Sequence, residues 1–149
     1  MKTADEIASL VEQAANSPAP LGDVLRYAVQ ILKQEREHYN WVGIYLVEGD
    51  LLVLHNYIGK PTEHVRIPVG MGVCGVAVAE GSNQIIADVT KLDNYLACSV
   101  ETRAEIVVLI RRGPDIFGQI DIDSDLENAF NHEDESLLAS VANLLAPRF

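Results

Sequence analysis

The spacing of apolar side chains changes twice along this chain, and the change restricts the folds that the chain can adopt. Before residue 38, apolar positions such as Val24, Ala28 and Ile31 recur three or four residues apart, as in an amphipathic helix. From Trp41 to Asp123 most apolar stretches are short, rich in β-branched and aromatic residues and separated by turn signals, which is typical of strands. A helical pattern returns near the C-terminus. Helices at both ends of a largely hairpin-connected sheet predict the α+β class.

The same patterns predict the individual elements. We expect helices over 3–15, 21–37, 73–79 and 135–145, and strands over 41–47, 51–58, 63–68, 84–87, 105–110 and 116–123. Residues 91–99 are expected to form a loop. Because no repeat or Pro/Gly/Ser-rich linker divides the chain, we predict one domain over 1–149. Its parts are an N-terminal helical segment (1–38) and a sheet with a ligand cavity and a C-terminal helix (39–149).

The charge and the N-terminus exclude several classes of partner. Against 22 acidic residues there are 11 Lys and Arg, so the formal net charge is −11. A chain of that sign is repelled by nucleic acid and by anionic membranes. Neither an apolar signal-peptide core nor an apolar run long enough to span a bilayer is present. Two cysteines are too few for a secreted disulfide framework, so we expect a cytoplasmic protein.

The strand that begins at Trp41 carries an unusual face. Alternate residues of a strand share one side, so Trp41, Gly43 and Tyr45 are expected to lie together. A glycine between two large aromatic side chains predicts a recess with aromatic walls and a bare floor, because a strand glycine often marks the close approach of a ligand. The alternative is ordinary core packing against a helix.

A second strand face is acidic. Asp121 and Asp123 alternate with isoleucines and therefore point to the same side, where they repel unless a cation or a shared proton lies between them. The segment that begins at Asp121 does not match an EF-hand calcium loop, because Leu126 and His132 stand at the sixth and twelfth positions, where Gly and Glu are needed. Glu105 begins the neighbouring apolar strand. If the two strands pair, three carboxylates converge on one site, suited to an ammonium group or a shared proton.

The two cysteines occupy different surroundings. Cys98 lies in a predicted loop, where a substrate has access, and Cys74 begins a short helix whose N-terminal partial charge favours the thiolate. The alternative for either residue is a small buried hydrophobe. With no CxxC and only scattered histidines, a zinc set is not expected. The glycine motif over 70–75 lacks a preceding buried parallel strand and a long following helix, so we also expect no bound nucleotide cofactor.

Taken together, these segments resemble the free methionine-(R)-sulfoxide reductases, which are single GAF domains with a catalytic role. The motifs that carry the resemblance appear in this order: Asn-Trp-Val-Gly-Ile-Tyr (40–45), Val-Arg-Ile-Pro (65–68), Gly-Val-Cys-Gly-Val-Ala (72–77), Ala-Cys (97–98), Glu-Ile-Val-Val (105–108) and Asp-Ile-Asp-Ser (121–124). The resemblance implies a mainly antiparallel sheet of about six strands flanked by helices. It places the ligand cavity on the face away from the terminal helices.

The resemblance also implies a role for each candidate residue. Cys98 is similar to the catalytic thiol, which becomes a sulfenic acid as methionine leaves. Glu105, Asp121 and Asp123 are similar to the carboxylates that hold and activate the substrate. Trp41 and Tyr45 are similar to the aromatic walls around its methyl end. The neighbours of the thiol, Ala97 and Ser99, are further candidate substrate contacts.

Two positions depart from the family pattern. His64 stands where the family has a third, resolving cysteine, and Ser99 stands where an Asp often follows the catalytic thiol. Either Cys74 is the resolving thiol or an external thiol reduces the sulfenic acid directly, with a thioredoxin-like protein as the expected reductant. A homodimer is compatible with the sequence. The alternatives are a non-catalytic GAF module that binds a small molecule or senses redox state, and a purely structural dimerisation domain.

Overall fold

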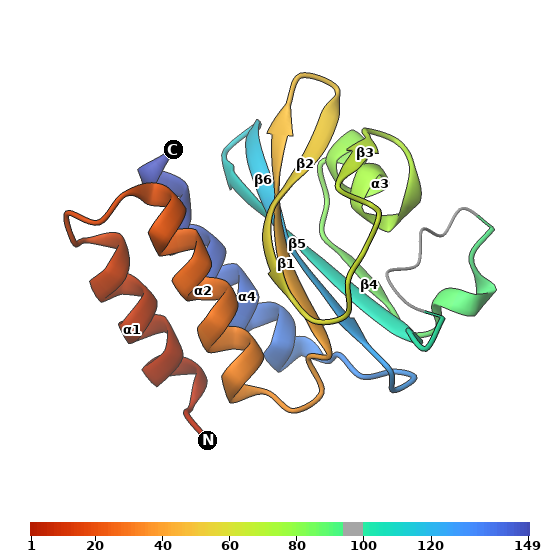
Figure 1. Cartoon of the computed structure of the whole chain (residues 1–149), viewed down its shortest axis with the longest axis horizontal. Coiled ribbons are helices and arrows are strands. Elements are labelled where there is room, and N and C mark those ends of the chain that lie inside the picture. Colours follow the sequence, from red (N-terminus) through yellow and green to blue (C-terminus); the bar gives the residue numbers. More distant parts are fainter. Residues whose placement is uncertain (94–99) are drawn as a thin grey trace.

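A six-stranded antiparallel sheet forms the centre of the structure, a computed structural model that describes residues 1–93 and 100–149 (Figure 1). The strand order is β3-β2-β1-β6-β5-β4, and every pair of neighbours is antiparallel. This arrangement confirms the predicted sheet. The strands are β1 (Trp41–Glu48), β2 (Leu51–Ile58), β3 (Arg66–Pro68), β4 (Gln84–Ile86), β5 (Ala104–Arg112) and β6 (Asp115–Ser124).

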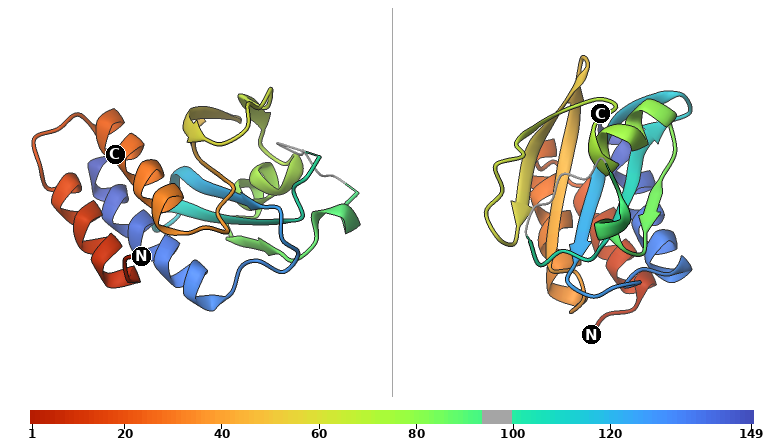
Figure 2. Two further views of the ribbon diagram at one scale, coloured as in Figure 1. Left: turned by 60° about the horizontal axis from the view of Figure 1, so that its bottom comes forward. Right: turned by 90° about the vertical axis from the view of Figure 1, so that its right-hand side faces the viewer.

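The helices are divided unequally between the two faces of the sheet. Helices α2 (Leu21–Glu35) and α4 (His132–Leu145) pack against one face, α1 (Ala4–Ala15) packs against these two helices on the same side, and α3 (Gly72–Glu80) lies on the other face (Figures 1 and 2). Short 3-10 turns follow at η1 (Val89–Lys91) and η2 (Ala146–Arg148). No helix in the described parts of the chain is long and apolar enough to cross a membrane.

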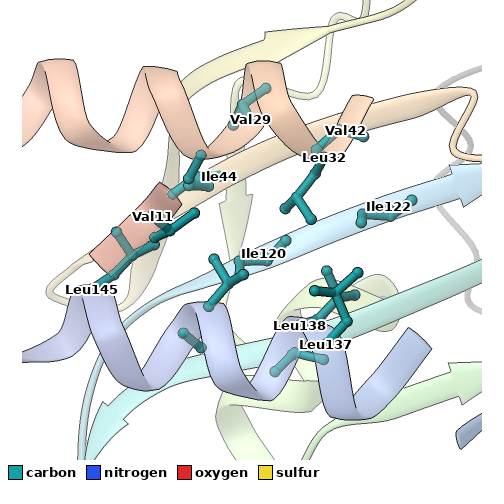
Figure 3. Packing of buried hydrophobic residues seen from close by; sticks show 14 of the residues in the cluster. Val11, Val29, Leu32, Val42, Ile44, Ile120, Ile122, Leu137, Leu138 and Leu145 are labelled. Atoms are coloured by element: carbon teal, nitrogen blue, oxygen red, sulfur yellow. The ribbon is translucent and has the colours of Figure 1, made fainter. Parts of the chain in front are cut away.

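Strand alternation builds the larger core between the sheet and the three helices. Val42 and Ile44 of β1 and Ile120 and Ile122 of β6 point toward the helices and are fully buried there (Figure 3). Burial of each such side chain contributes about 1.5–3 kcal/mol. Because one face of each central strand is used in this way, the side chains between these residues must point to the opposite face, under α3.

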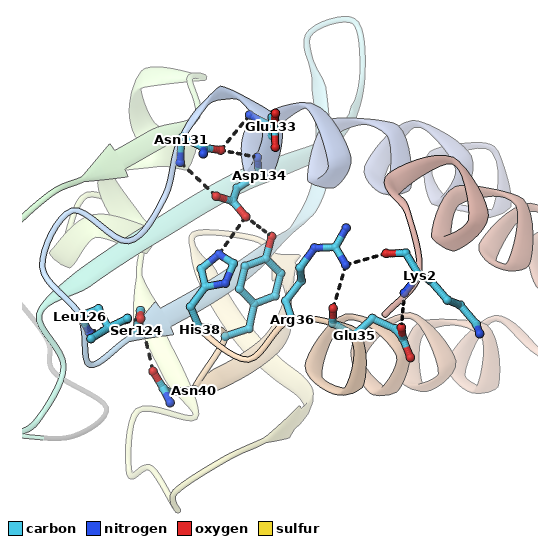
Figure 4. A network of polar contacts seen from close by, with 11 residues as sticks. Lys2, Glu35, Arg36, His38, Asn40, Ser124, Leu126, Asn131, Glu133 and Asp134 are labelled. Atoms are coloured by element: carbon cyan, nitrogen blue, oxygen red, sulfur yellow. Dashed lines mark hydrogen bonds and ion pairs between the residues drawn. The ribbon is translucent and has the colours of Figure 1, made fainter.

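A capping box fixes the start of α4, three residues earlier than the apolar pattern predicts. The side chain of Asn131 accepts hydrogen bonds from the backbone N–H groups of Glu133 and Asp134, and Asp134 accepts one from the N–H of Asn131 (Figure 4). The Tyr39 hydroxyl donates to the same Asp134 carboxylate at 2.6 Å, and His38 lies 3.0 Å from it. The first turn is polar and therefore shows no apolar repeat, which is why the pattern misses it.

Other helix and strand boundaries differ from the predicted ones by a few residues. Strand β3 begins at Arg66 rather than at residue 63, because the Thr62 side chain and the Glu63 carbonyl bond the following N–H groups and turn the chain. Helix α3 ends at Glu80, one residue beyond the predicted end, and its C-cap Gly81 has a φ of +67° that is accessible to glycine at little cost.

Candidate active site

The face of the sheet under α3 carries the acidic and aromatic residues in three rows across β5, β6 and β1. The residues in a row are directly opposite one another, so their side chains are neighbours. From one end of the site to the other, the rows are Glu105–Asp123–Trp41, Val107–Asp121–Gly43 and Leu109–Gln119–Tyr45. The pairing of β5 with β6 therefore confirms the predicted convergence of Glu105, Asp121 and Asp123 on one face.

Helix α3 closes this face from above, and Cys74 lies in its first turn. Apart from Glu80 the helix is apolar, and its first turn is buried against the sheet. The glycines before and within it permit close backbone packing: a Cβ at Gly75 would lie 3.0 Å from the backbone nitrogen of Gly70. That nitrogen donates to the Gly75 carbonyl at 2.8 Å. The glycines of residues 70–75 therefore allow the backbone of α3 to pack closely against the segment that precedes it.

The Cys74 thiol lies directly over the acidic rows. Its Sγ is 3.7 Å from Oε2 of Glu105, and donor atoms of Cys74, Glu105 and Asp121 all lie within 4.8 Å of one another. All three residues are buried, as is Gln119, whose side-chain amide donates to the Cys74 carbonyl at 3.0 Å. Gln119 was not among the predicted site residues, although its alternation with Asp121 was a usable signal.

Burial changes the protonation of these groups. The pKa of Glu105 is raised well above its usual value by burial and by the neighbouring charges of Asp121 and Asp123. Burial also raises the pKa of Asp121. The pKa of Cys74 is raised well above its usual value, first by burial and then by Asp121 and Glu105. The prediction that the helix N-terminus favours a Cys74 thiolate is therefore wrong, because desolvation and two carboxylates outweigh the helix dipole.

The aromatic residues enclose the other end of the site. Trp41 is 3% exposed, stacks on Tyr57 with 5.3 Å between ring centroids, and donates from Nε1 to the Lys60 carbonyl at 3.1 Å. Its ring also lies over Gly43, where a Cβ would be 2.6 Å from Cζ3 of Trp41. The predicted recess at Gly43 is therefore filled by the Trp41 ring, and its floor is not bare.

A small cavity lies where the aromatic and acidic residues meet α3. Its position, on the face away from the terminal helices, is as the resemblance implied. The Tyr45 hydroxyl reaches over to the His64 carbonyl, to which it donates at 2.7 Å, so the segment before β3 forms one rim. Side chains missed by the sequence interpretation also contribute to the lining, which comprises Tyr45, His64, Ile67, Met71, Gly72, Val73, Cys74, Glu105 and Asp121.

Three predicted site residues, Ala97, Cys98 and Ser99, lie outside the described residues. Glu101 lies close to the aromatic end of the site. Glu101 forms an ion pair with Lys60, the residue whose carbonyl accepts the indole hydrogen bond of Trp41.

The fold and the position of its cavity define the protein as a GAF domain, and a GAF domain family model matches residues 18–147. Within that class, the chain belongs to the family of free methionine-R-sulfoxide reductases. It is 42% identical over 120 residues to the free methionine-R-sulfoxide reductase of Escherichia coli, a match that covers 78% of this chain and 72% of the relative.

Solved structures agree with this placement. The type II free methionine-R-sulfoxide reductase of Thermoplasma acidophilum superposes with a TM-score of 0.81 at 41% identity, over 87% of this chain and 94% of that chain. The Neisseria meningitidis free methionine-R-sulfoxide reductase in complex with its substrate gives a TM-score of 0.91 at 33% identity, over 98% of this chain and 87% of that chain.

Proposed function

We propose that this protein reduces free L-methionine-(R)-sulfoxide to methionine with thiols as the source of electrons. The observation that carries the proposal is the cross-strand arrangement of acidic and aromatic side chains on β5, β6 and β1. Glu105, Asp121 and Asp123 are buried together beside Trp41 and Tyr45, in a chain of the free methionine-R-sulfoxide reductase family. An interior so acidic needs a cationic or proton-sharing ligand, and a free amino acid supplies an ammonium group.

The two ends of the site match the two ends of such a substrate. The carboxylates that remain ionised pair with the ammonium group, and Trp41 and Tyr45 surround the small apolar methyl end. A methionine sulfoxide residue inside a peptide has no free ammonium group. Its amide would leave the acidic residues without a cationic partner, which explains a preference for the free amino acid.

In the redox step, we assign Cys98 as the nucleophile. Its sulfur attacks the sulfoxide sulfur and forms an S–S bond as the protonated oxygen leaves as water; attack of water on the Cys98 sulfur then breaks the S–S bond, releases methionine and leaves Cys98 as a sulfenic acid. The cysteine sulfur is oxidised by two electrons and the substrate sulfur is reduced by two. Glu105 is suited to protonate the departing oxygen, because burial and the neighbouring carboxylates raise its pKa and so favour the protonated carboxyl.

The sulfenic acid then has two routes back to the thiol. Condensation with Cys74 forms a disulfide and releases water, and a thioredoxin-like dithiol in the cytoplasm reduces that disulfide. Cys74 is buried and its pKa is raised, so it must lose its proton to a neighbour before it attacks. In the second route, an external thiol reduces the sulfenic acid directly, and Cys74 does not have to lose its proton.

The decisive assay uses both sulfoxide epimers, free and peptide-bound, with dithiothreitol as the reductant. We expect turnover of the free (R)-epimer alone, and loss of turnover in Cys98→Ser with an unchanged circular dichroism spectrum. Reduction of the free (R)-sulfoxide by Cys98→Ser would refute the assigned nucleophile. No reduction of any substrate by the native protein would favour the non-catalytic GAF module.

Cys74→Ala separates the two routes of recycling. If Cys74 resolves, the variant releases about one methionine per protein in a single turnover but loses thioredoxin-dependent steady-state activity. An unchanged thioredoxin-dependent rate would assign recycling to an external thiol alone.

A further inference from the structure

We propose that Cys74, Glu105 and Asp121 form a binding site for one thiophilic divalent cation such as Zn²⁺. The three residues come from α3, β5 and β6, and their donor atoms converge within 4.8 Å in the cavity under the helix. The cation site goes beyond the reductase function, and the binding itself does not depend on that function.

The spacing of the donors is close to that of a tetrahedral zinc site. With Zn–S near 2.3 Å and Zn–O near 2.1 Å, tetrahedral angles place the sulfur and oxygen ligands about 3.6 Å apart. The observed distance from Cys74 Sγ to Glu105 Oε2 is 3.7 Å. The widest separation in the cluster is below 4.8 Å, so contraction by about 1 Å brings all three donors into coordination range.

An unpaired carboxylate oxygen gives a second, independent indication of a missing ligand. Asp121 is 1% exposed, and its Oδ1 has no hydrogen-bond partner in residues 1–93 and 100–149. A buried carboxylate oxygen without a partner is unfavourable, because its desolvation is not compensated by a hydrogen bond or a cation. Asp121 lines the cavity that it shares with Cys74 and Glu105, so a cation in this cavity would supply the missing partner of Oδ1.

The donor chemistry selects the class of metal. One thiolate and two carboxylates favour zinc or cadmium over magnesium or calcium, which take oxygen ligands only. On binding, the thiol and any protonated carboxyl release their protons to the buffer, and three negative charges then face two positive ones. Three protein ligands leave a fourth position for water, on the side of the cavity that Tyr45 and His64 line.

Occupation by a cation has a consequence that rests on the proposed function. Glu105 and Asp121 are assigned to the sulfoxide, and Cys74 is the candidate resolving thiol. A bound Zn²⁺ therefore competes with the substrate and withholds Cys74 from recycling, so the reductase would be inhibited by zinc and restored by a chelator.

The binding test uses the full chain with Cys98→Ser, in which Cys74 is the remaining thiol. Titration with Cd²⁺ should produce a thiolate-to-cadmium charge-transfer band that saturates at one equivalent. Zn²⁺ should displace the Cd²⁺ and raise the melting temperature, and calorimetry in two buffers of different ionisation enthalpy should detect proton release. Adding Glu105→Gln should weaken binding by about tenfold or more. Glu63→Gln, an exposed carboxyl before β3, is the matched control and should leave binding unchanged.

Two further variants decide which thiol binds the metal. A charge-transfer band that persists in Cys74→Ser and disappears in Cys98→Ser would overturn the proposal. So would the absence of both the band and the melting shift in Cys98→Ser at millimolar metal. Asp121→Asn on the Cys98→Ser background retains Cys74 and tests the same site if Cys74→Ser fails to fold. Because no arm measures sulfoxide reduction, failure here leaves the proposed enzyme activity to its own assay.

Discussion

The buried carboxyl of Glu105 predicts an unusual dependence of stability on pH. Its pKa is raised well above the usual 4.5 in the folded protein, so the folded state holds a proton that the unfolded state loses as the pH rises past that value. The free energy of unfolding therefore decreases as the pH rises above the usual pKa of the carboxyl and until its raised folded-state pKa is passed, by up to about 1.4 kcal/mol per pH unit for one proton. Asp121 has a raised pKa as well and contributes in the same direction.

Replacing Glu105 by Gln keeps the shape of the side chain and removes its titration. We expect the slope of unfolding free energy against pH to become flatter by up to about 1.4 kcal/mol per pH unit over this window. Urea denaturation at half-unit steps of pH measures it, and Glu12→Gln, an exposed carboxyl on α1, is the control with an unchanged slope. Identical slopes for Glu105→Gln and the native protein would show that Glu105 is ionised in the folded state and would refute the reasoning.

Three further changes test other parts of the structure. Gly43→Ala should displace the ring of Trp41, cost about 1–3 kcal/mol and shift the fluorescence of this single tryptophan; an unchanged spectrum would contradict the packing. Tyr39→Phe removes the hydrogen bond to Asp134 and should cost roughly 1–3 kcal/mol in urea denaturation, whereas a loss below about 0.5 kcal/mol would mean that the bond contributes little. Ile120→Ala should cost about 2–5 kcal/mol, and a smaller loss would indicate that the core collapses into the space.

Much of the fold could be predicted from local patterns. The two-residue alternation around Ile120 and Ile122 assigned Asp121 and Asp123 to one face before any partner strand was known, because backbone geometry alone fixes that alternation. The end of α3 was likewise predicted to within one residue, and Gly81 caps it there with a positive φ that glycine adopts at little cost. The apolar repeat placed the first residue of α4 at Glu135, three residues after its observed start at His132, because the capped first turn is polar.

The site depends on contacts between segments that are distant in the sequence, and local patterns predicted several of its properties wrongly. The helix position of Cys74 predicted a thiolate, but the carboxylates that raise its pKa come from β5 and β6. Gly43 suggested an open floor, but the Trp41 ring from the same strand lies across it. The spacing of cysteines and histidines gave no metal motif, because a site formed by Cys74, Glu105 and Asp121 has no short spacing along the chain.

The sequence by itself determined which side chains share a strand face and where most helices and strands lie, since these follow from the geometry of one segment. Only the tertiary structure decided that Glu105 stands opposite Asp123 and that α3 closes over both β5 and β6. The physical reason is that pKa values, unpaired oxygens and ligand distances depend on desolvation and on charges brought together by folding.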